Sequence, residues 1–557
     1  MKRINILLLI IALTTATSCK KYLEEDNKSS IVADEYYQTV DGYEKLINGA
    51  YSTLRTVYNT SNVYLFCAGT DMYVAGRTGD QPLSLSEYRN LTADDSYVLN
   101  FYTNLYRSIQ ICNMAIYFNG TTAANASLPA RKGEMQFLRA YYYFLLVQTF
   151  GGVPITTDRN TAPNESFTRS SAQETYDFII KEMNEALALV PETSAQYGRV
   201  NKRAIRHYLA KVHLTRGYES YGSSQDFQTA ATLADAAING QVLSTTFENL
   251  FYPGNEKDPE ILFSIQYDAA SLPTQSTGGN SQSNYFGPYQ GGSGATQGYP
   301  YRNYALVPTL YLFDRYNEND ARFDATFMVN YYDRYYDYYD RAADRANLNI
   351  KFYYKPKWDT LTDAQWRAVD PVHRRATTII PYSADWEASQ RTVLDNATPT
   401  VKKFDDPKSL FSVGNGSSTR DFFLARLGET YLIAAEAYFK LGNLGVAADR
   451  INEVRRRAAK PGRTAAMAIT AANVNIEFIL DERARELVGE YHRWFDLKRT
   501  GTLVDRTRIY NREIKVNWFD KGINPFLGTG GGLKTLRPIP SLTIDLNKGS
   551  ITQNPGY

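Results

Sequence analysis

Apolar residues recur with a helical period of about 3.6 residues over the first 240 positions and again after position 420. Gly151-Gly152-Val153-Pro154 and Pro191 follow two of these segments, where glycine and proline would end a helix. The pattern predicts a mainly α protein. The expected helices span residues 36–57, 97–118, 130–149, 172–190, 200–217, 225–239, 420–441, 444–459 and 472–499.

Neighbouring helices carry matching stripes of small and apolar side chains. The segment 427–441 ends at Gly442, and Ala447 and Ala448 begin a facing stripe. The segments 202–217 and 226–240 repeat this plan. Such pairs are similar to tetratricopeptide units, but they do not recur every 34 residues or so. We therefore expect an interrupted frame of tetratricopeptide-like helical pairs.

The pattern changes between residues 245 and 415. Clusters of Gly, Ser and Asn separate short apolar runs such as 261–265, and three of the five tryptophans occur here. This composition predicts loops, short strands and a few helices inserted into the helical frame.

The N-terminus has the features of a secretory leader. Lys2 and Arg3 precede an apolar run over 6–13, and small residues lead to Cys19. They resemble the lipobox of bacterial lipoproteins, in which Cys19 would be the lipidated first residue; a leader with a chance cysteine is the alternative. The expected divisions are a signal peptide (1–18), a tether (19–35), an N-terminal helical region (36–244), the inserted region (245–415) and a C-terminal helical region (416–557).

Charge and cysteine content further narrow the kind of protein that this sequence can encode. The 61 Lys and Arg residues balance 59 Asp and Glu residues, which argues against a nucleic-acid partner. No segment after the leader has the roughly 20 apolar residues of a membrane-spanning helix. Cys67 and Cys112 could form one bridge, but two unpaired buried thiols are favoured.

Four segments in a fixed order carry a family resemblance. They are the helix 138–150 with its Gly-Gly-Val-Pro stop, the helical pair 431–459, the charged segment 479–501, and the end Leu536-Arg-Pro-Ile-Pro540 with Gln553-Asn-Pro-Gly-Tyr557. With the lipoprotein-like start, they resemble the SusD/RagB family of outer-membrane nutrient-uptake lipoproteins. The resemblance implies a SusD-like fold built on tetratricopeptide-like pairs, in which the variable, loop-rich region 245–415 would face the ligand. The acidic Glu24-Glu25-Asp26 is similar to surface-export signals of Bacteroidetes lipoproteins.

The resemblance also implies a function. We expect a lipid-anchored protein on the outer face of the outer membrane that binds an oligosaccharide and passes it to a SusC-like TonB-dependent transporter. Catalysis, a cofactor and nucleic-acid binding are not expected. A peptide-binding RagB-like uptake protein and a helical-repeat scaffold without a small ligand are the alternatives.

The residues themselves give no catalytic signature. The chain has no Gly-x-Ser-x-Gly elbow, no Walker A loop and no His-Glu-x-x-His motif, and His207 and His213 lie six apart on one predicted helix. The charged segment 481–499 is better explained by local ion pairs. The expected pairs are Asp481–Arg485, Glu482–Arg485, Glu490–Arg493 and Asp496–Arg499.

Aromatic and planar polar residues are the candidates for ligand contact. The chain has 44 tyrosines, which combine an apolar face with a hydroxyl group. Asp71, Tyr73 and Arg77 lie where members of the resembled family place binding residues, and Asp71 and Trp358 are the leading candidates. The inserted region contributes Tyr285, Tyr289, Tyr301, Trp358, Trp366 and Trp386. For each residue, packing in the core is the competing interpretation.

A weaker candidate is a calcium site. Asp333, Asp337, Asp340 and Asp344 would share one face of a helix over 330–346, and carboxylate oxygens suit Ca²⁺. Arginines alternate with these aspartates, so an ion-paired surface is favoured over a metal site.

Overall fold

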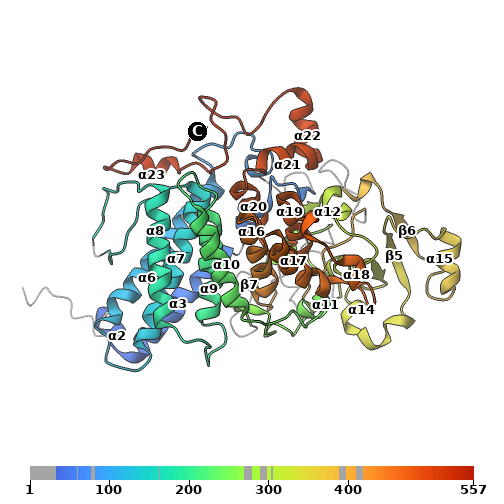
Figure 1. Ribbon diagram of the computed structural model, residues 1–557, viewed down its shortest axis with the longest axis horizontal. Helices are drawn as coiled ribbons and strands as arrows, with labels where there is room; N and C mark the ends of the chain where they lie inside the picture. The colour runs from blue at the N-terminus through green and yellow to red at the C-terminus, as the bar shows by residue number, and fades with distance from the viewer. Residues whose placement is uncertain are drawn as a thin grey trace, which may run out of the picture.

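The computed structural model describes residues 33–58, 60–76, 82–160, 162–268, 279–288, 298–302, 305–387, 397–408 and 418–557. Long helices dominate it, which confirms the predicted mainly α class. Figure 1 shows the N-terminal helices side by side at one end, the C-terminal helices in the middle, and a lobe of short strands at the other end.

The N-terminal helices pack around α7 (Leu128–Phe150). Every residue of α7 from Gly133 to Phe150 is buried, so this helix forms the centre of the N-terminal half. It packs against α6 and α8, and α9 packs against α10. The other elements here are α2 (Ala33–Tyr37), α3 (Val40–Tyr58), a 3₁₀ turn (Thr60–Asn62), α4 (Val63–Cys67), α5 (Leu83–Ser86), α6 (Ser96–Asn119), α8 (Ala172–Leu189), α9 (Lys202–Arg216) and α10 (Ser224–Ile238).

Side-chain caps explain where several of these helices begin. Ser171 and Glu174 form a reciprocal capping box at the start of α8, and Asn201 accepts a hydrogen bond from the Ala204 amide at the start of α9. Each cap satisfies amide groups that have no partner within the helix, typically worth about 1 kcal/mol. The Asn201 cap thus fixes the end of the loop 190–201 that leads into α9.

The C-terminal helices continue the same packing. Helix α16 packs against α10 and α17, which joins the two helical halves into one body. The elements are α16 (Leu427–Lys440), α17 (Leu444–Ala458), α18 (Thr464–Met467), α19 (Ile476–Glu486), α20 (Arg493–Arg499), α21 (Leu503–Tyr510), α22 (Arg512–Asn517), α23 (Ser541–Asp545) and 3₁₀ turns at Ala471–Asn473 and Phe519–Lys521.

The strands form three small sheets. Strand β1 (Tyr73–Ala75) pairs with β3 (Leu306–Pro308), and β2 (Ile261–Ile265) pairs with β7 (Phe422–Arg426), both antiparallel. Strand β5 (Ile350–Lys355) lies between β4 (Asn330–Tyr332), antiparallel, and β6 (Thr378–Pro381), parallel. The accompanying short helices are α11 (Phe247–Leu250), α12 (Leu310–Asp314), α13 (Arg322–Thr326), α14 (Asp337–Asp340) and α15 (Asp363–Val369), with 3₁₀ turns at Gln282–Tyr285, Ala342–Asn347 and Ala384–Trp386.

Three helix predictions need correction. The segment 420–441 begins as strand β7, because Phe422–Arg426 pairs with β2, and α16 starts only at Leu427. The segment 472–499 is interrupted between α19 and α20, where Gly489 and Tyr491 both have positive φ. The segment 330–346 is not one helix but a strand, a short helix and a 3₁₀ turn.

The core is one extended cluster that runs through both helical halves, with a smaller cluster in the strand lobe. Five tyrosines build most of the smaller cluster: Tyr331, Tyr332, Tyr335, Tyr336 and Tyr338. Cys67 and Cys112 are buried and unpaired, as the sequence favoured. Among the described residues, no helix has both the length and the apolar character needed to cross a bilayer.

The charged segment 481–499 lies in the interior. Of the expected local pairs, Glu482–Arg485 (2.5 Å) and Asp496–Arg499 (3.0 Å) form. The other two do not, because their members bind distant elements. Asp481 pairs with Arg315 (2.7 Å) and Arg506 (3.0 Å), Glu490 pairs with Arg426 (2.7 Å), and Arg493 pairs with Asp71 (2.6 Å).

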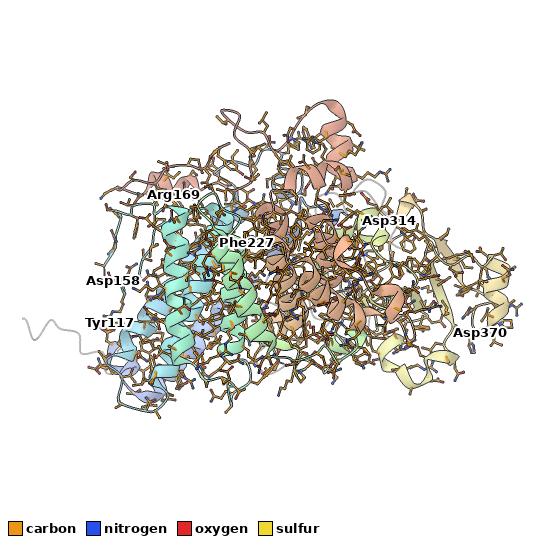
Figure 2. All side chains as sticks on the ribbon, viewed as in Figure 1. Tyr117, Asp158, Arg169, Phe227, Asp314 and Asp370 are labelled. Carbon is orange, nitrogen blue, oxygen red and sulfur yellow. The ribbon has the colours of Figure 1, made fainter. Side chains whose placement is uncertain are left out.

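The last residues fasten the tail onto α7. Arg169, labelled in Figure 2, donates to the Gly152 carbonyl (2.7 Å) and to Asn554 Oδ1 (2.6 Å). Asn554 Nδ2 donates in turn to the Phe150 carbonyl (2.8 Å). The chain end therefore caps the central N-terminal helix.

Candidate functional site

Two adjoining cavities lie where α3, the loop before α9, the end of β2 and the start of β7 meet. Their volumes are about 430 and 580 Å³, and Tyr197 and Gln266 line both of them. We call the two together the Tyr197 hollow. The first cavity is lined by residues of α3 and of 196–199, and the second by residues of 253–257, 266–268, 406–408 and 419–421.

Tyr197 is exposed yet firmly held. Its side chain is 40% exposed, and its hydroxyl group donates to Asp421 Oδ2 (2.9 Å), with the Ser264 hydroxyl 3.3 Å away and the Glu256 carbonyl also in contact. The loop before α9 positions it, because Gly198 has φ of +86° and a Cβ there would lie 2.1 Å from Gln266 Nε2. The result is a fixed aromatic ring that faces solvent.

Asp421 is the group that fixes this ring. It accepts hydrogen bonds from the Tyr267 amide (2.9 Å) and from Tyr197. Burial raises the pKa of Asp421, and the hydrogen bonds from Tyr267 and Tyr197 oppose that rise. With both donors bound, the Asp421 carboxyl group holds the Tyr197 hydroxyl group and the Tyr267 amide in place.

Planar polar side chains line the first cavity together with Tyr197. Arg55 donates from Nε (3.0 Å) and Nη2 (2.6 Å) to the Gln266 carbonyl, and its guanidinium lies 4.8 Å from the centre of the Tyr267 ring. Arg199 pairs with Glu44 (3.0 Å) and Glu134 (2.9 Å). An exposed ring beside guanidinium and amide groups is suited to stacking on a sugar ring while bonding its hydroxyl groups.

Asp71 and Tyr73, which the sequence indicates as candidates for ligand contact, are buried in the core at β1. Asp71 is completely buried, and it pairs with Arg493 and Arg506 (2.8 Å). Tyr73 is also buried, and its hydroxyl accepts a hydrogen bond from the Gly489 amide (2.8 Å). A buried carboxylate needs such partners, so Asp71 binds the C-terminal helices rather than offering its oxygens to a ligand.

The aromatic residues of the inserted region are mostly packed. Trp386 is completely buried against Phe313, and the buried Trp366 stacks on Tyr353 with ring centres 4.4 Å apart. Tyr285 is 9% exposed. Of the aromatic candidates that the structure describes, Trp358, which packs on Phe323, and Tyr301 are half-buried. Arg77, Tyr289 and Cys19 lie outside the described residues.

The proposed calcium ligands form ion pairs with arginines. Arg334 lies 3.4 Å from Asp337 and 3.6 Å from Asp340, and Arg341 pairs with Asp344. Asp333 accepts a hydrogen bond from Asn349 (3.3 Å). In the described part of the chain, no group of three metal-ligating side chains is assembled. The observed surface is the ion-paired one that the sequence favoured.

Sequence reasoning missed the Tyr197 hollow. Its parts come from segments as far apart as 48–55, 196–199 and 419–421, and only the fold brings them together. One signal was present: Tyr197 stands next to Gly198 in a polar loop, the same context that singled out Tyr285 and Tyr301.

Comparisons with known proteins agree over nearly the whole chain. Residues 259–557 match the model of the SusD family, and residues 21–214 match a model described as starch-binding and associating with the outer membrane. SusD-like protein P2 of Formosa agariphila is 25% identical over 571 residues, which covers 98% of each chain.

Solved structures share the fold. A laminarin-binding SusD-like protein has a TM-score of 0.67 and 22% identity, covering 94% of this chain and all of its own. Surface glycan-binding protein A from Bacteroides thetaiotaomicron, in complex with laminarihexaose, has a TM-score of 0.65 and 18% identity, covering 93% of this chain and all of its own.

Proposed function

The chain belongs to the SusD family, and from this premise we propose that it captures an oligosaccharide at the cell surface and passes it, uncleaved, to a SusC-like TonB-dependent transporter. A laminarin-binding protein and a laminarihexaose complex among the similar structures support a carbohydrate ligand. The description of the second family model supports a place at the outer membrane.

The Tyr197 hollow is the observation that carries the proposal. Sugars offer flat faces of C–H groups and a rim of hydroxyl groups, so a binding site needs a fixed ring and planar hydrogen-bonding groups together. Tyr197, Arg55 and Gln266 supply this combination at the junction of two cavities. The combined space is of the size that accommodates a short oligosaccharide.

Anchoring and delivery complete the proposed role. A lipid on Cys19 would hold the body on the membrane through the segment before α2, which begins at Ala33. Lipid attachment through several acyl chains gives stable membrane binding. Trp358 and Tyr301 remain secondary candidates for ligand contact because each is half-buried.

Substitution of Tyr197 tests the capture site. Tyr197→Ala should weaken glycan binding about ten- to a hundredfold, the effect of losing about 1–3 kcal/mol from one stacked ring. Tyr197→Phe keeps the ring but loses the bond to Asp421, so its loss should be smaller. Glycan-array screening followed by titration calorimetry measures both. Tyr117→Ala is the matched control, because Tyr117 is an exposed tyrosine on α6 (Figure 2) that lines neither cavity.

Other outcomes of the same experiment contradict the proposal. Binding of peptides in place of glycans would favour the RagB-like alternative. Unchanged glycan affinity in Tyr197→Ala would exclude the Tyr197 hollow as the capture site. Failure of a large outer-membrane protein to co-purify with the native lipoprotein would count against delivery to a transporter.

A further inference from the structure

The cations around the Tyr197 hollow are unequally neutralised. Arg199 shares Glu44 and Glu134 with Arg131, so two arginines and two glutamates balance. Arg55 forms no ion pair within the described part of the chain, and its hydrogen bonds go to a carbonyl oxygen. One uncompensated guanidinium therefore lies on the wall of the first cavity.

Arg55 retains free hydrogen-bond donors. A guanidinium has five N–H groups, and the bonds to the Gln266 carbonyl use one on Nε and one on Nη2. The contact with the Tyr267 ring fixes its plane. The remaining N–H groups form the planar fork that binds a carboxylate or sulfate through two parallel bonds.

A second unneutralised cation lies on the other side of the exposed ring. Lys257 lines the second cavity, its Nζ is 5.2 Å from the centre of the Tyr197 ring, and the described residues offer it no ion pair. Arg55 and Lys257 thus flank Tyr197 from the two cavities. Positive charge left without a partner in a recessed site attracts anions.

The acids of the second cavity are already engaged. Glu256 pairs with Arg420 (2.7 Å), and Asp421 accepts from Tyr197 and Tyr267. Asp406 accepts from the Thr419 amide (2.8 Å) and the Ser418 hydroxyl (2.9 Å), and Asp268 also has a partner. These hydrogen bonds and ion pairs hold the walls together. Of the cations that line the two cavities, Arg55, Lys257 and the exposed Lys408 have no ion pair in the described part of the chain.

We infer that the captured glycan is acidic, with a uronate carboxylate or a sulfate ester bound by Arg55 while the adjoining sugar stacks on Tyr197. The inference rests on the proposed function and names the class of its ligand. Carboxylate and sulfate share the chemistry that a guanidinium fork recognises, so the test includes both.

The test compares acidic and neutral probes on matched variants. The wild type is screened on an array of neutral, uronate-containing and sulfated oligosaccharides, and the best binder is titrated by calorimetry beside laminarihexaose at low and high salt. Acidic probes should bind best, and their affinity should fall with salt. Arg55→Gln should weaken binding of the acidic probe at least tenfold and weaken laminarihexaose by a much smaller factor, because glutamine keeps a planar hydrogen-bonding group but loses the charge.

Two further variants separate charge from fold. Arg55→Lys keeps the charge but loses the fork, so it should bind the acidic probe with intermediate affinity. Arg508→Gln removes an exposed arginine from α21 and should change nothing. Neutral glycans at the top of the array, or an unchanged acidic affinity in Arg55→Gln, would overturn the inference while leaving glycan capture intact. No carbohydrate binding at all would overturn both proposals.

Discussion

At the scale of single residues, Glu387 is a carboxyl group held in an unfavourable place. It is 4% exposed, one oxygen accepts from the Leu310 amide (2.9 Å), and the described residues offer the other oxygen no hydrogen-bond partner. Burial raises the pKa of Glu387 to about 7, against the opposing bond from Leu310 and the charge of Arg512. The ionised form of Glu387 therefore destabilises the folded state.

Ionised Glu387 lowers the free energy of unfolding only at a pH above about 4.5. The pKa of Glu387 is higher in the folded state than in the unfolded state, so its contribution to stability falls as pH rises from about 4.5 to about 7. Glu387→Gln should therefore raise the free energy of unfolding at pH 8 by up to about 3 kcal/mol and change it little at pH 4.5. Urea titrations at both pH values measure this. A difference that does not depend on pH would contradict it.

At the scale of elements, the break between α19 and α20 has a clear physical cause. Gly489 adopts φ of +73°, and a Cβ there would lie 2.3 Å from the Phe404 ring. Its amide donates to the buried Tyr73 hydroxyl. The turn precedes α20, whose first residue, Arg493, pairs with Asp71 (2.6 Å).

Gly489→Ala tests this interpretation. The left-handed conformation costs a side chain about 1–2 kcal/mol, and crowding against Phe404 adds about 1–3 kcal/mol. The free energy of unfolding should therefore fall by about 2–5 kcal/mol. Gly522→Ala is the control, because Gly522 has φ of +75° with open space around it, and only the backbone cost should appear. Equal losses in both variants would show that Phe404 does not constrain the break.

The sequence predicted the elements with local causes and missed those set by distant partners. Helical periodicity and the glycine and proline stops placed α6 to α10 and α17 within a few residues. Periodicity did not show that 422–426 pairs with β2, or that 487–492 breaks a helix, because both depend on tertiary contacts. The same limit hid the Tyr197 hollow. The opposite error concerns Trp366 and Trp386. Their polar stretch of sequence suggested ligand contact, but the fold buries both side chains.

At the scale of the whole molecule, buried ion pairs connect the inserted region to the C-terminal helices. Arg426 at the end of β7 contacts Glu260 (3.0 Å), Glu486 (2.6 Å) and Glu490 (2.7 Å). Burial would raise the pKa of Glu486, but Arg457, Arg426 and neighbouring arginines lower it to about 2. Each charge is tolerated only because the others are present.

Removal of Arg426 should therefore be severe. Arg426→Met leaves buried carboxylates short of a partner, and breaking such a pair costs about 3–5 kcal/mol. Arg456→Met is the control, because the half-exposed Arg456–Glu453 pair (2.6 Å) is worth less than about 1 kcal/mol. Chemical denaturation of both variants gives the comparison. Similar losses would show that the network does not depend on Arg426.

The ion pair between Asp71 and Arg493 also determines when, during synthesis, the growing chain can complete this contact. The two residues are 422 positions apart, and Asn554, which closes the end of α7, lies 404 positions beyond Phe150. A ribosome that adds about 5–20 residues each second needs roughly 20–80 s to travel from Asp71 to Arg493. Throughout that interval Asp71 has no Arg493 to bind, and the end of α7 has no Asn554 cap. The unfinished chain therefore leaves these polar groups of the interior without their partners until its final segment is made.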